Sequence, residues 1–205
     1  MKITQADLLP NENVILSKNA NAIIKLTDYG LSQFAFDKYM WAVGMKGKEA
    51  IGGRVHLTNY RLIFKSHKLN GLKGKFSIFL PTIRTVRNSS FLISRKVTVG
   101  TGLSNFDFVI WGIPAFFKEL NAAQDKLTTD EIKKLKIDIL NNYEKCGEGL
   151  QIFGGLETLN KIFLRGAKVQ QLSELATNPF EAIGAMALEE LFDQTVASPW
   201  QKNFE

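Results

Sequence analysis

The chain has 205 residues, 45% of them hydrophobic and 22% charged, with a formal net charge of +6 and one cysteine. This balance predicts a globular protein with a buried core, and it excludes a long disordered chain and a disulfide-stapled scaffold. No run of eighteen apolar residues occurs in the sequence, which excludes a transmembrane helix.

The first part of the chain predicts short strands. Asn13–Leu16 and Ala22–Leu26 are apolar and flank the polar stretch Lys18–Asn21, which indicates two strands with a break between them. Tyr39–Val43 predicts another strand. The stretch Thr27–Lys38 is ambiguous, with a short inserted helix as one interpretation.

Residues 52–65 carry the clearest pattern, two strands joined by a tight polar turn at Thr58-Asn59. Asparagine tolerates the left-handed backbone that such turns need. Alternation along each strand sends one set of side chains to a core and the other to solvent. The inward set is Val55, Leu57, Leu62 and Phe64, and the outward set is Arg54, His56, Arg61 and Lys65.

The strand pattern continues with Phe76–Leu80, which ends at Pro81 because proline cannot donate to a sheet. Ile83–Val86 leads to a turn, and Phe91–Val99 and Ser104–Trp111 are further strands. Some seven short strands at close spacing predict a sandwich or a partly open barrel. Pro114 then opens a helix with apolar residues at helical spacing, namely Phe116, Phe117, Leu120 and Ala123.

The remainder of the chain predicts helices. Thr128–Glu131 is a capping box that starts one helix, and Gly147 ends it. Leu150–Leu164 and Lys168–Ala176 are the next two, and Asn178-Pro179 opens a fourth that ends at Ser198-Pro199. Its apolar stripe is Phe180, Ile183, Ala187 and Leu191. We expect these helices to pack on one another or on the sheet, with an oligomer or partner surface as the alternative.

Residues 52–64, with the sequence GGRVHLTNYRLIF, resemble the central hairpin of the GRAM family, a branch of the pleckstrin-homology-like superfamily. The resemblance covers about residues 10–125. It implies an α+β fold, a seven-stranded, partly open β-barrel or sandwich capped by a C-terminal helix. The chain would then comprise a GRAM/PH-like domain at 1–126 and an all-α helical extension at 127–205. The family resemblance implies a binding module and not an enzyme.

Residues 65–75, with the sequence KSHKLNGLKGK, form a lysine-rich loop after the hairpin. Lysines attract anionic lipid headgroups with about 1 kcal/mol each, and leucines can enter the interfacial zone. Related pleckstrin-homology-like domains use such a rim for phosphoinositides, which implies a phospholipid ligand; a solvated loop without a ligand is the alternative. The predicted lipid-binding residues are Arg54, Arg61, Lys65, Lys68, Leu69, Leu72, Lys73 and Lys75.

The charge is uneven along the chain. Residues 1–126 hold 18 Lys+Arg and 8 Asp+Glu, whereas residues 127–205 hold 8 and 12. A basic first part favours an anionic partner, or attraction between the two parts. Nucleic acid is disfavoured because aromatics such as Phe76 and Phe106 are needed in the core. A protein partner bound by a sheet edge or by the helical extension is the alternative function.

Catalytic signals are weak. His56, His67 and Cys146 are too few and too scattered for a zinc site. Gly71–Ser77 and Gly100–Ser104 lack the spacing of phosphate-binding and dinucleotide-binding loops. We therefore expect no enzyme, no cofactor and no metal. The lone cysteine and the absence of a secretory signal at the N-terminus predict a cytoplasmic protein, peripheral at the inner membrane surface if lipid is its ligand.

Overall fold

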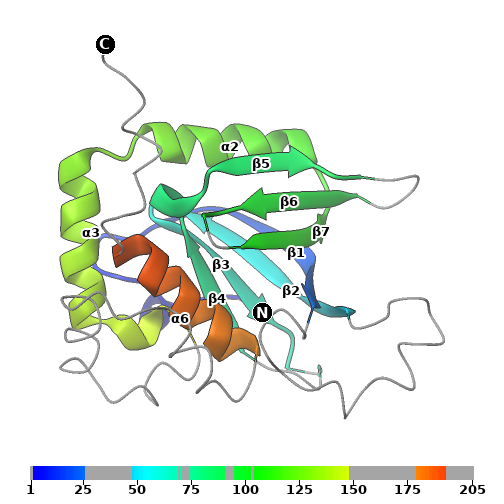
Figure 1. The fold of residues 1–205 in the computed structure, drawn as a ribbon, viewed down its shortest axis with the longest axis horizontal. Coiled ribbons are helices and arrows are strands. Elements are labelled where there is room, and N and C mark those ends of the chain that lie inside the picture. Colours follow the sequence, from blue (N-terminus) through cyan, green and yellow to red (C-terminus); the bar gives the residue numbers. More distant parts are fainter. Residues whose placement is uncertain are drawn as a thin grey trace.

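A computed structural model describes residues 2–25, 48–68, 70, 74–90, 95–102, 104–147 and 179–192 (Figure 1). The strands are β1 (Val14–Lys25), β2 (Lys48–Thr58), β3 (Arg61–Ser66), β4 (Lys75–Phe79), β5 (Thr85–Asn88), β6 (Lys96–Gly100) and β7 (Asn105–Ile110). The α-helices are α2 (Ile113–Asp125), α3 (Thr129–Asn141) and α6 (Pro179–Phe192). Short 3-10 turns are η1 (Gln5–Asp7), η3 (Leu80–Thr82) and η4 (Tyr143–Lys145).

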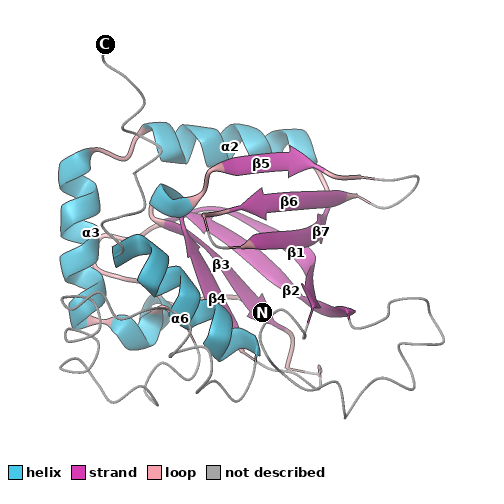
Figure 2. Ribbon diagram, viewed as in Figure 1, coloured by secondary structure: helices cyan, strands magenta, loops and turns pink. Residues whose placement is uncertain are grey.

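The seven strands form one antiparallel sheet in the order β4-β3-β2-β1-β7-β6-β5, so the fold is α+β with an open sheet (Figure 2). β1 pairs with β2 along its length and with β7 through Ala20–Ile23. The predicted break at Lys18–Asn21 is wrong. Asn19 and Asn21 point outward while Ala20 and Ala22 are buried, so the polar stretch keeps the alternation of a single strand.

The central hairpin is confirmed, with Val55 opposite Phe64 and Leu57 opposite Leu62. Its turn differs from the expectation, because Asn59 does not adopt the left-handed backbone; among the described non-glycine residues only Asn11 does. The Thr58 hydroxyl instead accepts hydrogen bonds from the backbone N–H groups of Tyr60 (3.1 Å) and Arg61 (3.0 Å). The side-chain oxygen of Asn59 accepts a hydrogen bond from the backbone N–H of Asn13 at 2.8 Å.

The sheet curls around one hydrophobic core. In a flat sheet β4 and β7 would lie about 19 Å apart, since four strand spacings separate them. The rings of Phe76 on β4 and Phe106 on β7 nevertheless approach to 6.1 Å between centroids. The helix that follows β7 adds Phe116, Leu120 and Ala123 to this core, as the sequence predicts, while Phe117 is half-buried at its margin.

The described part of the helical extension packs on the sheet. Phe180 and Ile183 of α6 enter the core of the sheet, and the Phe180 ring lies 5.9 Å from that of Phe76. Farther along α6, Leu188 and Leu191 join Leu135 and Ile139 of α3 in a second cluster. The predicted stripe on α6 is therefore confirmed as buried surface. The division at 126/127 stays a prediction, but segments on both sides of it share a core.

The boundaries shift at several elements. The capping box at Thr128 starts α3 as predicted, whereas the helix ends at Asn141 and a 3-10 turn precedes Gly147. β5 begins at Thr85, later than the expected Ile83, and β6 (Lys96–Gly100) matches the end of the expected strand Phe91–Val99, of which residues 91–94 lie outside the described residues. The predicted elements Thr27–Lys38, Tyr39–Val43, Leu150–Leu164 and Lys168–Ala176 lie outside the described residues. No helix in the described ranges is long and apolar enough to cross a membrane.

Candidate functional site

Strand pairing assembles a row of polar side chains across the outer face of the sheet. Asn19 on β1 lies opposite Arg54 on β2, Arg54 opposite Lys65 on β3, and Lys65 opposite Lys75 on β4. The Arg54 Nε donates to the Asn19 side-chain oxygen at 2.8 Å, so both side chains stand on the same face. We call these four residues the outer row. Neighbouring strands are about 4.8 Å apart, so three cations fall within about 10 Å.

Beyond the row lies the loop that the sequence singled out. Lys68 and His67 are exposed, and the backbone N–H of His67 donates to the carbonyl of Gly52 at 2.9 Å. Asn70 donates to the same carbonyl through its side chain. Leu69, Leu72 and Lys73 lie outside the described residues, so their predicted roles stay predictions.

A carboxylate already sits on the outer row. Asp7 accepts from Lys65 at 2.8 Å and from Lys75 at 3.0 Å, and it also accepts from the backbone N–H of Thr4 at 2.9 Å. Burial alone would raise the pKa of Asp7, but these charged and backbone donors outweigh it and hold the pKa well below its usual range. Asp7 neutralises one of the three positive charges in the row, which leaves a net charge of about +2 there.

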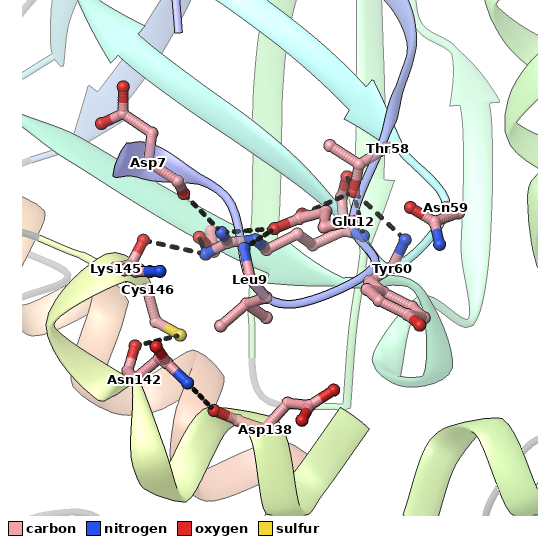
Figure 3. A network of polar contacts seen from close by, with 12 residues as sticks. Asp7, Leu9, Glu12, Thr58, Asn59, Tyr60, Asp138, Asn142, Lys145 and Cys146 are labelled. Carbon is pink, nitrogen blue, oxygen red and sulfur yellow. Dashed lines mark hydrogen bonds and ion pairs between the residues drawn. The ribbon is translucent and has the colours of Figure 1, made fainter. Parts of the chain in front are cut away.

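Arg61 does not belong to this surface. Its side chain is fully buried, and its five N–H groups all donate. Nε and Nη2 donate to the two Glu12 oxygens at 2.8 Å each. The remaining donors reach the Ser77 hydroxyl at 2.9 Å, the Lys145 carbonyl at 3.0 Å and the Asp7 carbonyl at 2.9 Å. Figure 3 shows the network around Arg61, with Asp7 and Glu12 from the N-terminal segment, Thr58 from the hairpin and Lys145 from η4.

The expectation that Arg61 faces solvent is therefore wrong. Alternation correctly puts it on the outer face, but residues 7–12 and η4 cover that face at this end of the hairpin. Burial by itself would lower the pKa of Arg61, yet the facing Glu12 carboxylate raises it and the guanidinium stays charged. No donor is left to reach a headgroup, so Arg61 is a structural residue in this arrangement.

His56 is likewise buried, against the expectation of a surface residue. Its Nδ1 lies 2.7 Å from the hydroxyl of the exposed Ser17, its cross-strand neighbour on β1. Sequence alternation gives the face of a residue correctly, but it carries no signal for a distant segment that covers that face. Glu12 and Asp7, which cover Arg61, stand in a segment without any recognisable motif.

Cys146 is buried beside this network. Burial raises the pKa of its thiol to about 11, although the nearby Arg61 charge acts in the opposite direction. The thiol therefore stays neutral near pH 7 and is a poor nucleophile. In the ranges that the structure describes, no three His, Cys, Asp or Glu side chains are grouped so as to hold a metal ion.

Trp111 is a surface residue that the sequence did not distinguish from its neighbours. It directly follows Ile110, the last residue of β7, and Ile110 pairs with Ala20, the residue after Asn19. Its side chain is 66% exposed. The Arg95 guanidinium lies over the ring at 4.2 Å from the centroid.

Comparison with solved structures finds partial likenesses. The C-terminal domain of an unknown protein from Leishmania infantum is similar with 17% identity and a TM-score of 0.39, covering 57% of this chain and 88% of that one. The Vps36 N-terminal PH domain is similar with 14% identity and a TM-score of 0.39, covering 60% of this chain and 89% of that one. No family model and no curated protein matches the chain.

Proposed function

We propose that this chain is a non-enzymatic binding module with a GRAM-type, pleckstrin-homology-like sheet, and that its outer row binds the headgroups of an anionic phospholipid surface. The hairpin sequence at 52–64, the strand order and the helix that packs into the core after β7 support this assignment. The outer row lies on the side of the sheet away from its core, and the side chains of Lys65 and Lys75 there are 18% and 13% exposed beside Asp7.

One observation carries the proposal: Lys65 and Lys75 already hold an anionic oxygen, that of Asp7, between them. The row is thus spaced to bind an anion from two sides. Among the interactions described for Arg54, the side chain makes one hydrogen bond, to the uncharged Asn19. Lys68 is exposed in the loop that follows β3. These two cations are the ones that can meet a headgroup without first displacing Asp7.

The test is sedimentation of the full chain with vesicles of phosphatidylcholine alone or mixed with phosphatidylserine. We expect binding only to the mixed vesicles, and a loss of about 25-fold in Arg54→Gln/Lys68→Gln, since each charge near an anionic surface contributes about 1 kcal/mol. The matched control removes two exposed charges from α3, in Lys133→Gln/Lys134→Gln. Equal losses in both variants would mean that the chain responds to net charge and that the row is not a site.

The alternative is a protein-interaction module that uses a sheet edge. β5 is an end strand of the sheet, and Thr85, Arg87 and Asn88 are exposed on it, so its outer backbone groups are placed to pair with an added strand. Binding that ignores vesicle charge, together with a size-exclusion shift lost on Val86→Pro, would favour this function. Proline removes the backbone donor that strand addition needs.

A further inference from the structure

Trp111 is the most exposed large apolar residue in the described ranges at 66%, followed by Ile137 on α3 at 60%. Val14 and Ile15 are 39% and 38% exposed, and the aromatic rings on the strands mostly face the core. Single exposed apolar residues are ordinary on protein surfaces, so exposure alone indicates nothing. Three further observations support a binding role for Trp111: its position in the fold, the charges of its neighbours and the chemistry of its ring.

Its place is the end of the molecule away from α3. Only Gly112 separates Trp111 from the start of α2, and the far end of α2 leads into α3. A helix of 13 residues is about 20 Å long, so Trp111 stands well clear of the helices at the other end. It also lies near the Asn19 end of the outer row, because Ile110, the residue before it, pairs with Ala20, the residue after Asn19.

Its charged neighbours are cations. Arg95 covers one face of the ring at 4.2 Å. The Lys18 ammonium lies beside Gly112, so close that a Cβ added there would meet Nζ at 2.9 Å. The acidic side chain on this side of β7 is Asp107, and it is held by Lys96 at 3.1 Å and by the Thr98 hydroxyl. The surroundings of the ring therefore complement a negatively charged surface.

We propose that Trp111 is an interfacial anchor that enters the headgroup region of an anionic membrane, with Arg95 and Lys18 paired to lipid phosphates beside it. This inference rests on the proposed function and extends it. The proposed function involves only charged side chains, whereas Trp111 adds an apolar contact with the membrane. Tryptophan suits the boundary between headgroups and acyl chains, since its ring is largely apolar and its indole N–H can still donate. Arginine can keep its stacking contact while its outer donors reach a phosphate.

The geometry also sets the orientation of the bound molecule. Asn19, Arg54, Lys65 and Lys75 follow one another across four neighbouring strands, and Trp111 comes directly after Ile110, whose cross-strand partner Ala20 is next to Asn19. Because the sheet curls, its outer face is convex, and a flat bilayer at Trp111 meets the near end of the outer row, at Asn19 and Arg54, before the far end at Lys65 and Lys75. The anchor and the cations then act on the same bilayer at the same time, which makes their contributions multiply in the binding constant.

The experiment uses the full chain with Trp41→Phe and Trp200→Phe, which leaves Trp111 as the single tryptophan. Vesicles of phosphatidylcholine and phosphatidylserine are prepared with and without brominated acyl chains. We expect the fluorescence of Trp111 to shift to shorter wavelength on binding and to be quenched by the brominated lipid. Trp111→Ala should weaken sedimentation by about tenfold and Arg95→Gln by about fivefold. The control Ile137→Ala removes a side chain that is 60% exposed on α3 and should change nothing.

The outcomes separate the two proposals. Charge-dependent sedimentation with an unshifted and unquenched Trp111 would overturn the anchor and leave the outer row as the binding site. Failure to sediment with any vesicle would overturn the proposed function, and the anchor with it. Thermal unfolding of Trp111→Ala and Trp111→Phe checks that a lost signal does not come from a lost fold, and Trp111→Phe should retain part of the affinity.

Discussion

At the scale of single residues, Arg61 shows how one side chain connects segments that are far apart in sequence. Its donors reach Glu12 in the N-terminal segment, Ser77 on β4 and the Lys145 carbonyl in η4. Glu12 in turn accepts from the Leu9 backbone at 2.7 Å and from the Thr58 hydroxyl at 2.8 Å. Each buried charge is therefore fully hydrogen-bonded, which is the condition under which a buried ion pair is tolerated.

Breaking this pair should be costly because it leaves one charge buried without its counterion. We expect Glu12→Gln and Arg61→Met each to lower the free energy of unfolding by about 3–5 kcal/mol. Urea denaturation at neutral pH measures the loss. The control Asp130→Asn, which breaks the exposed ion pair with Lys133, should leave the midpoint unchanged. A loss as small as that of the control in Glu12→Gln would show that Arg61 is held by its neutral partners.

At the scale of elements, the hairpin is a case in which the sequence predicts the face of each side chain but not whether another segment covers that face. The alternation of Val55, Leu57, Leu62 and Phe64 is local information, and the structure buries all four. The cover over Arg61 is not local, because it comes from residues 7–12 and η4. The outer row depends on the pairing register, which the sequence does not state. The sequence therefore predicts Arg54, Lys65 and Lys75 as site residues, but it does not predict that they stand in one row.

The two glycines at the start of the hairpin have different roles, although the sequence presents them as a pair. A Cβ at Gly53 would meet the Lys65 carbonyl oxygen at 2.4 Å and the Phe64 ring at 2.7 Å. A Cβ at Gly52 would meet Asn21 and His67 side-chain atoms at 3.5 and 3.6 Å, which is ordinary contact. Gly53 is thus required for close approach of β2 to β3, while Gly52 is not.

Gly53→Ala should therefore lower the free energy of unfolding by about 1–3 kcal/mol, because a backbone oxygen and a core ring would both have to shift. Gly52→Ala is the matched control in the same strand and should be neutral or stabilising by up to about 1 kcal/mol, since alanine restricts the unfolded chain. Thermal unfolding followed by circular dichroism measures both. Equal midpoints for the two variants would contradict the close approach at Gly53.

At the scale of the whole molecule, α6 connects the two hydrophobic clusters. Its first turns place Phe180, Ala182 and Ile183 in the core of the sheet, and its later turns place Leu188 and Leu191 against α3. Glu190 accepts from the Gly102 backbone N–H and so joins α6 to the turn between β6 and β7. The helical stripe on α6 was predictable from spacing, but its target was not, because an apolar stripe does not specify which surface covers it.

This arrangement makes a prediction about the division of the chain at residue 126. A fragment of residues 1–126 lacks α6, so the rings of Phe64 and Phe76 lose their contacts with Phe180, at 6.4 and 5.9 Å. We expect the fragment to bind a hydrophobic dye and to unfold at lower temperature than the full chain, without a sharp transition. In the full chain, Phe180→Ala should reproduce part of the effect and cost about 3–5 kcal/mol. A fragment that unfolds as cooperatively and at the same temperature as the full chain would show that the sheet and α2 form an independent domain, with α6 only resting on its core.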